Sequence, residues 1–208
     1  ACIGAQTIKS KLAPELSKKG VILCDMATAV TEHGELLEKY LYQLAIQAGT
    51  DRLTALNLAL MDSGNFLYVP SNVDIKQPLS ILTIQDSRQR QNFVNHTLII
   101  GGSNSHFTVF QSIETIGQEA NPAHITAEII AQPDSYIKYS SLDSLGQNTY
   151  SYFNRHGYLQ QDSRIDWAMG VFNNGSSIAD FDSDLYGTGA HTEMQTVALS
   201  SGRQTQGL

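Results

Sequence analysis

The sequence predicts a mainly β fold, in which a small helical amino-terminal region precedes a β-solenoid. Three observations predict it. Charged residues make up only 16% of the 208-residue chain, less than is usual for soluble domains, while Ser, Thr, Asn and Gln together make up about 30%. Short turn-like tetrads recur about every 14 residues between residues 102 and 205. After most tetrads, apolar and polar residues alternate as in a strand with one buried face.

Residues 1–64 are predicted to form the helical region, with one short strand. Lys9 to Lys18 suits a polar helix interrupted near Pro14, and residues 21–24 suit a buried strand. Between residues 32 and 47 an apolar stripe recurs at helical spacing, formed by Leu36, Leu37, Tyr40, Leu41 and Leu44.

A further helix is predicted to begin after Thr50 or Asp51, because either residue suits an N-cap. It carries Leu53, Leu56 and Leu60, and Gly64 suits its end. We expect both leucine stripes to pack against a neighbouring core. The alternative is a helix that binds a partner.

Residues 65–208 are predicted to form the β-helix core. Residues 66–69, 79–84 and 97–100 have strand composition, and the tetrads end at residues 105, 135, 149, 163, 176, 190 and 205. The interval between the tetrads that end at residues 105 and 135 is about twice as long as the others, and the segment 117–120 lies at its midpoint. The apolar phase breaks after Ala120 and after Ser176, which indicates a bulge or a longer loop. An antiparallel sandwich or barrel is the alternative, but Asn174-Gly175 is the only Asn-Gly hairpin signal, which favours stacking.

Charge and apolar content exclude several classes of partner. The net charge is −7 and the pI about 5.2, whereas nucleic-acid binding needs a concentrated basic surface. No apolar run is long enough to span a membrane, and no segment resembles a signal peptide. Cys2 and Cys24 are too few for a disulfide framework. We therefore expect two free thiols in a reducing cytoplasm.

The sequence contains no G-x-S-x-G elbow, P-loop or H-E-x-x-H motif. His106 and His191 each follow a corner and are predicted to share one solenoid face as surface residues. Asp180, Asp182 and Asp184 alternate and are predicted to share one solvated face, with a weak cation site as the alternative. We assign no catalytic, cofactor-binding or metal-binding residue. The pattern by itself indicates a strand-rich interaction or scaffold protein and does not point to a reaction.

Several motifs follow one another in a distinctive order along the chain. They are residues 64–70, Val73 with Pro78-Leu79, residues 96–100, Asn104-Ser105, residues 165–167 and residues 184–190. This succession resembles the SufB/SufD family of iron–sulfur cluster assembly proteins. Residues 20–25 and the helix around Leu36-Leu37 are similar to the amino-terminal region of the SufD branch. Gln111-Ser112 also favours that branch, because SufB-type scaffolds tend to carry a cysteine there.

The resemblance implies a right-handed parallel β-helix flanked by helices. It also implies a non-enzymatic cytoplasmic subunit that works with a SufB-like scaffold and a SufC-like ABC ATPase. The cluster is then handled by the full complex, and no cofactor is expected in these residues. Members of the family are considerably longer, and their ATPase-docking segment, late strands and late Cys/His motif have no counterpart here. We therefore transfer no functional residue and expect an amino-terminal fragment with an open solenoid end.

Two other functions fit a β-solenoid. One is a carbohydrate-active enzyme, which needs clustered carboxylates or basic residues on one face and usually secretion. The other is a structural or adhesive solenoid, which leaves the helical region unexplained.

Overall fold

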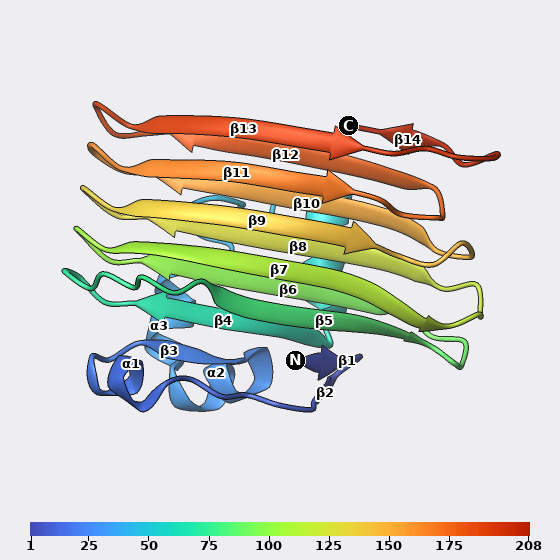
Figure 1. The fold of residues 1–208 in the computed structure, drawn as a ribbon, viewed down its shortest axis with the longest axis horizontal. Helices are drawn as coiled ribbons and strands as arrows, with labels where there is room; N and C mark the ends of the chain where they lie inside the picture. Colours follow the sequence, from blue (N-terminus) through green and yellow to red (C-terminus); the bar gives the residue numbers. More distant parts are fainter.

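The computed structural model describes residues 1–208, in which four short helices lie among the first strands of a long series (Figure 1). The helices are α1 (Pro14–Lys18), α2 (Met26–Glu32), α3 (Gly34–Tyr40) and α4 (Arg52–Leu60). The strands are β1 (Cys2–Ile3), β2 (Gln6–Thr7), β3 (Ile22–Asp25), β4 (Ser63–Val69), β5 (Leu79–Ser87), β6 (Phe93–Gly101), β7 (His106–Gly117), β8 (Pro122–Ala131), β9 (Tyr136–Ser144), β10 (Tyr150–Leu159), β11 (Arg164–Val171), β12 (Ser177–Leu185), β13 (His191–Ala198) and β14 (Gln206–Gly207). None of the helices is long and apolar enough to cross a membrane.

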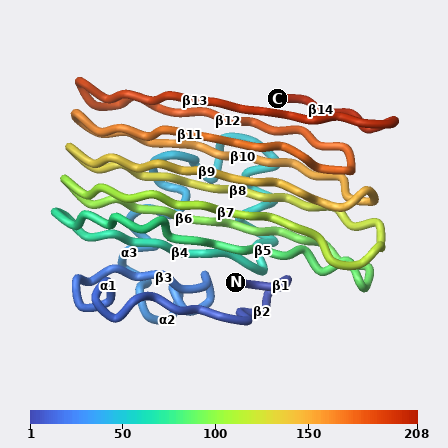
Figure 2. Tube along the Cα trace, viewed as in Figure 1, coloured from blue at the N-terminus to red at the C-terminus, as the bar shows by residue number.

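From β4 onward the chain winds into a solenoid, as predicted. Successive strands alternate between two seven-stranded sheets. Sheet A has the order β13-β11-β9-β7-β5-β1-β2, and sheet B has the order β14-β12-β10-β8-β6-β4-β3. Figure 2 shows the two sheets lying against each other as the trace climbs from coil to coil. From β4 to β14 every ladder is parallel, so the antiparallel alternative is wrong.

Each predicted unit of about 14 residues is half of one coil. A strand pairs with the strand two positions earlier, at offsets such as Ser63 with Asn95 and Ser151 with Ser177. Two units that follow each other in the sequence therefore lie in opposite sheets and face each other across the interior. The unit directly below a given unit in the stack is the one two positions earlier.

The predicted corners lie at the strand starts. Strands β7, β9, β10, β11, β12, β13 and β14 each begin one residue after a tetrad ends. The predicted break in the apolar alternation after Ala120 is also present. Strand β8 begins only at Pro122, which is exposed, and Ala123 is the first residue that points inward. After Ser176 the inward residues are Ser177 and Ala179, while Ile178 is exposed.

One edge of the solenoid is a ladder of left-handed corners. Asn72, Asn104, Asp134 and Asp162 all have positive φ, between 51° and 62°, and Gly189 takes the same place in the last coil. Asn, Asp and Gly are the residues that tolerate this conformation. The backbone amide of each corner donates to a carbonyl of the next coil, for example Asn104 to Pro133 and Asp134 to Gln161, at 2.9 and 3.0 Å. The corners therefore add hydrogen bonds to the stack beyond those of the sheets.

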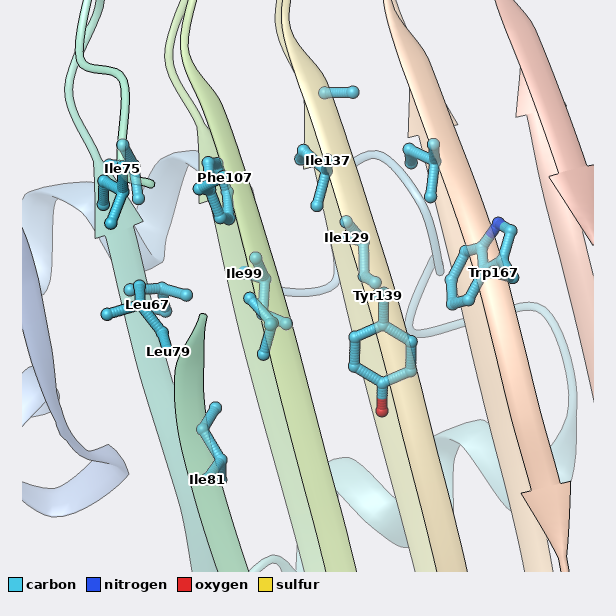
Figure 3. Packing of buried hydrophobic residues seen from close by; sticks show 14 of the residues in the cluster. Leu67, Ile75, Leu79, Ile81, Ile99, Phe107, Ile129, Ile137, Tyr139 and Trp167 are labelled. Carbon is cyan, nitrogen blue, oxygen red and sulfur yellow. The ribbon is translucent and has the colours of Figure 1, made fainter. Parts of the chain in front are cut away.

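The core lies between the two sheets. Figure 3 shows inward side chains stacked in columns from coil to coil, among them Phe107 and Ile137 on adjacent strands of sheet A. The largest apolar cluster has 18 buried residues drawn from both sheets. Trp167 packs edge-to-face on Tyr139, with ring centroids 5.3 Å apart. Burial of these side chains supplies the main stabilising free energy of the solenoid.

The amino-terminal residues cover the first coil. Strands β1 and β2 extend sheet A, while β3 pairs antiparallel with β4 and ends sheet B. We predicted one short strand in this region, and β1 and β2 were missed because two-residue strands carry no periodicity. Gly64 does not end a helix, as we expected, but lies within β4. A Cβ there would come within 2.1 Å of the His96 carbonyl oxygen.

The two leucine stripes behave differently. The first packs as predicted, with Leu37 and Tyr40 buried against sheet B. The second does not. Asp51 caps α4 through hydrogen bonds from the amides of Leu53 and Thr54, but the helix buries Thr54 and Asn57. Its exposed side chains include Leu53, Leu56 and Leu60, at 43–49% exposure.

Candidate functional site

The candidate site lies where the segment between α3 and α4 meets the outer face of sheet B. Strand β8 places Glu128 there with no solvent exposure, because the helical region covers this part of the sheet. One carboxylate oxygen of Glu128 accepts from the Tyr42 amide at 2.9 Å, and the other accepts from the Ile46 amide at 3.2 Å. A carboxylate thereby supplies the hydrogen bonds that the buried backbone of an irregular segment needs.

His96, on β6, is the second buried member of this site. Its Nε2 lies 3.0 Å from the Glu128 carboxylate, and its Nδ1 lies 3.0 Å from the Tyr42 hydroxyl oxygen. The Tyr42 hydroxyl donates to Asn57 Oδ1 at 2.6 Å. Burial, and then the nearby Glu128 charge, raise the pKa of Tyr42, so the phenol keeps its proton and remains a donor.

This arrangement positions chain segments and does not expose a reactive group. Glu128 is fully buried under the helical region, so its carboxylate does not face a substrate in solvent. Through Asn57 the network also fixes the polar face of α4 on sheet B. The site joins the helical region to the solenoid.

A second polar cluster lies inside the solenoid. Arg155 and Asp143, on β10 and β9, are both fully buried and form a bidentate pair at 2.6 and 2.7 Å. The guanidinium lies between the rings of Phe153 and Phe181, 5.0 and 5.4 Å from their centroids. Burial lowers the pKa of Arg155, but the charge of Asp143, the charge of Tyr139 and the hydrogen bonds to both residues together raise it overall. The guanidinium therefore stays protonated inside the solenoid.

A row of hydrogen bonds links the interior of several coils. Tyr139 donates to Gln111, Gln111 donates to Thr97, and Asn65 also donates to Thr97, at 2.6, 3.1 and 3.4 Å. The Cys2 thiol lies 3.8 Å from the Asn65 carbonyl oxygen. Polar residues at inward positions were the only sequence signal for this row, and no motif marked it.

His106 and His191 share the outer face of sheet A, as predicted, but do not meet. In the paired register they occupy one column, with Tyr136 and Arg164 between them. Three strand spacings separate them, roughly 14 Å, so the two rings cannot bind one ion. Both residues are exposed.

Asp180, Asp182 and Asp184 share the exposed outer face of β12, as predicted. Asp184 lies 3.2 Å from His156 Nε2, whereas Asp180 and Asp182 form no ion pair. No group of three or more His, Cys, Asp or Glu residues is placed to hold a metal ion, so the structure offers no support for the cation-site alternative.

The two cysteines are free thiols that line one cavity of about 380 Å³ at the amino-terminal end of the solenoid. Cys2 is buried and Cys24 is partly buried. Burial, followed by the charges of Asp25 and Glu32, raises the pKa of Cys24 to about 11. At neutral pH the thiol is protonated and a weak nucleophile.

Comparison with known proteins gives a consistent result along the chain. The family described as "SUF system FeS cluster assembly, SufBD core domain" matches residues 83–208, and the "SufBD protein N-terminal region" matches residues 4–81. The chain is 35% identical over 197 residues to the iron–sulfur cluster assembly protein SufD of Bacillus subtilis, covering 94% of this chain and 45% of that protein.

More distant relatives include SufBD family proteins of Staphylococcus epidermidis and Staphylococcus aureus. Each is 24% identical over 203 residues, which cover 97% of this chain and 43% of the relative. The chain thus spans less than half the length of the curated relatives that it matches.

Proposed function

The chain belongs to the SufBD family of iron–sulfur cluster assembly proteins, and from this membership we propose that it serves as a SufD-like, non-catalytic subunit of an assembly scaffold. The observation that carries the proposal is the match to the SufD protein of Bacillus subtilis, which extends over 94% of the chain. Gln111-Ser112, where SufB-type scaffolds tend to carry a cysteine, supports the SufD branch.

The chemistry of the buried groups supports a non-catalytic role. Glu128 is fully buried, Arg155 and Asp143 pair with each other, and the raised pKa of Cys24 keeps its thiol protonated. None of these groups combines a free nucleophile with a base in reach. A stack of coils held by such contacts suits a rigid scaffold.

The proposed partners are a SufB-like subunit and a SufC-like ATPase in the cytoplasm. In the resembled family the segments that bind them lie late in the sequence. Because the chain covers 45% of its Bacillus relative, these partners are proposed for the full-length protein and not for residues 1–208 alone. Within the chain, we propose residues 1–64 as the helical region and residues 65–208 as the solenoid core.

Affinity purification of the full-length protein, co-expressed with the SufB-like and SufC-like proteins of the same organism, tests the proposal. We expect a stable complex under reducing conditions, and cluster assembly in the complex that is lost when this subunit is left out. Failure of the three proteins to associate, or undiminished assembly without this subunit, would contradict the proposal.

A further inference from the structure

The pair Asn174-Gly175 lies in the corner between β11 and β12. It does not form the hairpin turn that this pair often makes. The Asn174 amide donates to the Leu145 carbonyl oxygen of the corner below at 2.9 Å. A Cβ on residue 175 would lie 2.0 Å from the Thr149 carbonyl oxygen, so the close approach of the two corners requires glycine here. The stacking of corners therefore keeps a glycine directly after an exposed asparagine.

An asparagine followed by glycine carries the groups needed for its own deamidation. The backbone nitrogen of the glycine attacks Cγ of the asparagine side chain, and ammonia leaves with the proton of that nitrogen as a cyclic succinimide forms. Water then adds to one of the two ring carbonyls and breaks its bond to nitrogen, giving an aspartyl or an isoaspartyl residue. The sum is the hydrolysis of one amide by water. Glycine favours ring closure, because it has no Cβ to block the approach of its nitrogen.

Both reacting groups are free of hydrogen bonds in this corner. The Asn174 side chain is exposed and forms no hydrogen bond within the chain, and the Gly175 amide donates to no acceptor. An amide that donates must give up its hydrogen bond before its nitrogen can react, which costs free energy. Gly175 has no such bond to lose. Both residues also line a largely polar cavity of about 640 Å³, which gives water access to them.

The corner that follows in the stack is already in place above this one. The Gln204 side chain donates to the Asn173 carbonyl oxygen at 2.9 Å, and the Thr205 amide donates to Ser176 Oγ at 3.1 Å. The side chain of Asn174 stays exposed between these contacts. Its exposure therefore does not depend on the absence of a neighbouring corner.

Asn148 lies in the preceding corner and provides an internal comparison. It is also exposed, but its side chain donates to the Gln118 carbonyl oxygen at 2.7 Å. The next amide, that of Thr149, donates to the Gly146 carbonyl oxygen at 3.0 Å. Thr149 is also β-branched, which hinders the approach of its nitrogen to the Asn148 side chain. Neither reacting group is free at this position.

Asn104 is restrained in the same way at the opposite edge of the solenoid. Its side chain donates to Asn72 Oδ1 at 2.9 Å, and the following amide, that of Ser105, donates to the Gly102 carbonyl oxygen at 3.0 Å. Exposure alone therefore does not distinguish Asn174 from other corner asparagines. The distinction lies in the free side chain together with the free glycine amide.

We propose that Asn174 deamidates spontaneously in the folded protein, through a succinimide formed with the nitrogen of Gly175. The modification is independent of the proposed role in cluster assembly, because it rests on the geometry of one corner. Its isoaspartyl product adds a backbone carbon where Gly175 already packs closely on the Thr149 carbonyl oxygen. The modified corner therefore cannot keep its contact with the corner below unchanged.

The test incubates the folded full-length protein at pH 8 in water enriched in oxygen-18 and then digests it with trypsin in ordinary water. Ring opening in the labelled water gives a product about 3 Da heavier than the asparagine form, whereas deamidation before or after the incubation adds about 1 Da. Tandem mass spectrometry locates the change within the peptide of residues 165–203. We expect the labelled product at Asn174 to form at least about tenfold faster than at Asn148 or Asn104, because ring closure requires close approach of the reacting atoms.

Asn174→Gln is the matched variant, because glutamine keeps the amide but must close a larger ring. It should remove the labelled product from position 174, and circular dichroism should show the variant folded. Asn148→Gln is the control and should leave the rate at Asn174 unchanged. Protein-isoaspartate methyltransferase should label the incubated parent protein and not the incubated Asn174→Gln variant. Equal rates at the three asparagines, no labelled product at Asn174, or a product that forms only in urea-unfolded protein would overturn the proposal.

Discussion

Arg155 and Asp143 form an ion pair that the solenoid encloses completely. Taking two charges out of water costs several kcal/mol each, and only good geometry with each other offsets this cost. The bidentate contact and the two flanking phenyl rings supply that geometry. Removing one partner leaves the other charge buried without compensation, so each residue depends on the other.

We expect Asp143→Asn and Arg155→Met each to lower the free energy of unfolding by about 3–5 kcal/mol. Combining the two changes in one protein, Asp143→Asn with Arg155→Met, should cost clearly less than the sum of the single changes. Urea unfolding of the single and double variants measures this. The surface pair Arg88 and Asp86 is the control, where Arg88→Met should cost far less because solvent screens the pair. Additive losses at Arg155 and Asp143 would refute the coupling.

The alkylation rate of the Cys24 thiol should depend steeply on pH. Its pKa is raised to about 11, so the thiolate fraction is small until the pH approaches that value. In a Cys2→Ser variant, we expect iodoacetamide to alkylate Cys24 at pH 8 roughly a hundredfold more slowly than an unperturbed thiol. The rate should rise about tenfold per pH unit up to pH 10. A plateau below pH 9 would show that the pKa is not raised.

Sequence reasoning did not find the buried polar residues. Glu128 accepts from the amides of Tyr42 and Ile46, which lie 86 and 82 residues earlier. No spacing or motif encodes a contact between a side chain and a distant backbone. Conversely, the exposed faces of His106, His191 and the three aspartates were predictable, because residues two apart in a strand share a face.

At the scale of single elements, the corners were predictable and the orientation of α4 was not. A corner is a local event, in which an Asn, Asp or Gly adopts a left-handed conformation and a small residue follows. The leucine spacing of α4 correctly predicts a helix. It does not say which face is buried, because that choice rests on the hydrogen bonds of Asn57 with distant Tyr42 and Asn95.

The corner ladder gives a prediction at this scale. Asp134 has a φ of 61°, which a β-branched residue tolerates poorly. We expect Asp134→Val to lower the free energy of unfolding by about 1–2 kcal/mol, and Asp134→Asn to leave it nearly unchanged. Thr188→Val is the control, since the Thr188 carbonyl oxygen accepts the corner hydrogen bond from the Asp162 amide but Thr188 itself has no positive φ. Urea unfolding gives the three values, and equal losses for the two valine variants would contradict the explanation.

At the scale of the whole molecule, the coils depend on their neighbours to different degrees. Strands such as β8 and β9 pair on both sides, whereas β13 pairs only with β11, and β14 pairs with β12 through two residues. The last coil also exposes apolar side chains, including Val197 and Leu199. The stability of a stacked array is close to a sum over adjacent units, so the stability of each strand depends on how many residues it pairs with on either side.

Amide hydrogen exchange of the 208-residue chain should reveal this gradient. We expect the slowest exchange in β6 to β10 and exchange at least about a hundredfold faster in β13 and β14. Mass spectrometry of peptides from each strand measures the rates. Uniform protection from β6 to β13 would show that the array unfolds only as a single cooperative unit.

The parallel stacking also has a consequence for synthesis on the ribosome. Each strand needs only the coil made just before it, at offsets between 26 residues, as from Ser151 to Ser177, and 32 residues, as from Ser63 to Asn95. The solenoid can therefore assemble vectorially as the chain emerges. The segment around Tyr42 is the exception, because its buried acceptor Glu128 is translated 86 residues later. The segment between α3 and α4 is therefore synthesised first but can pack stably against the solenoid only after β8 has been made.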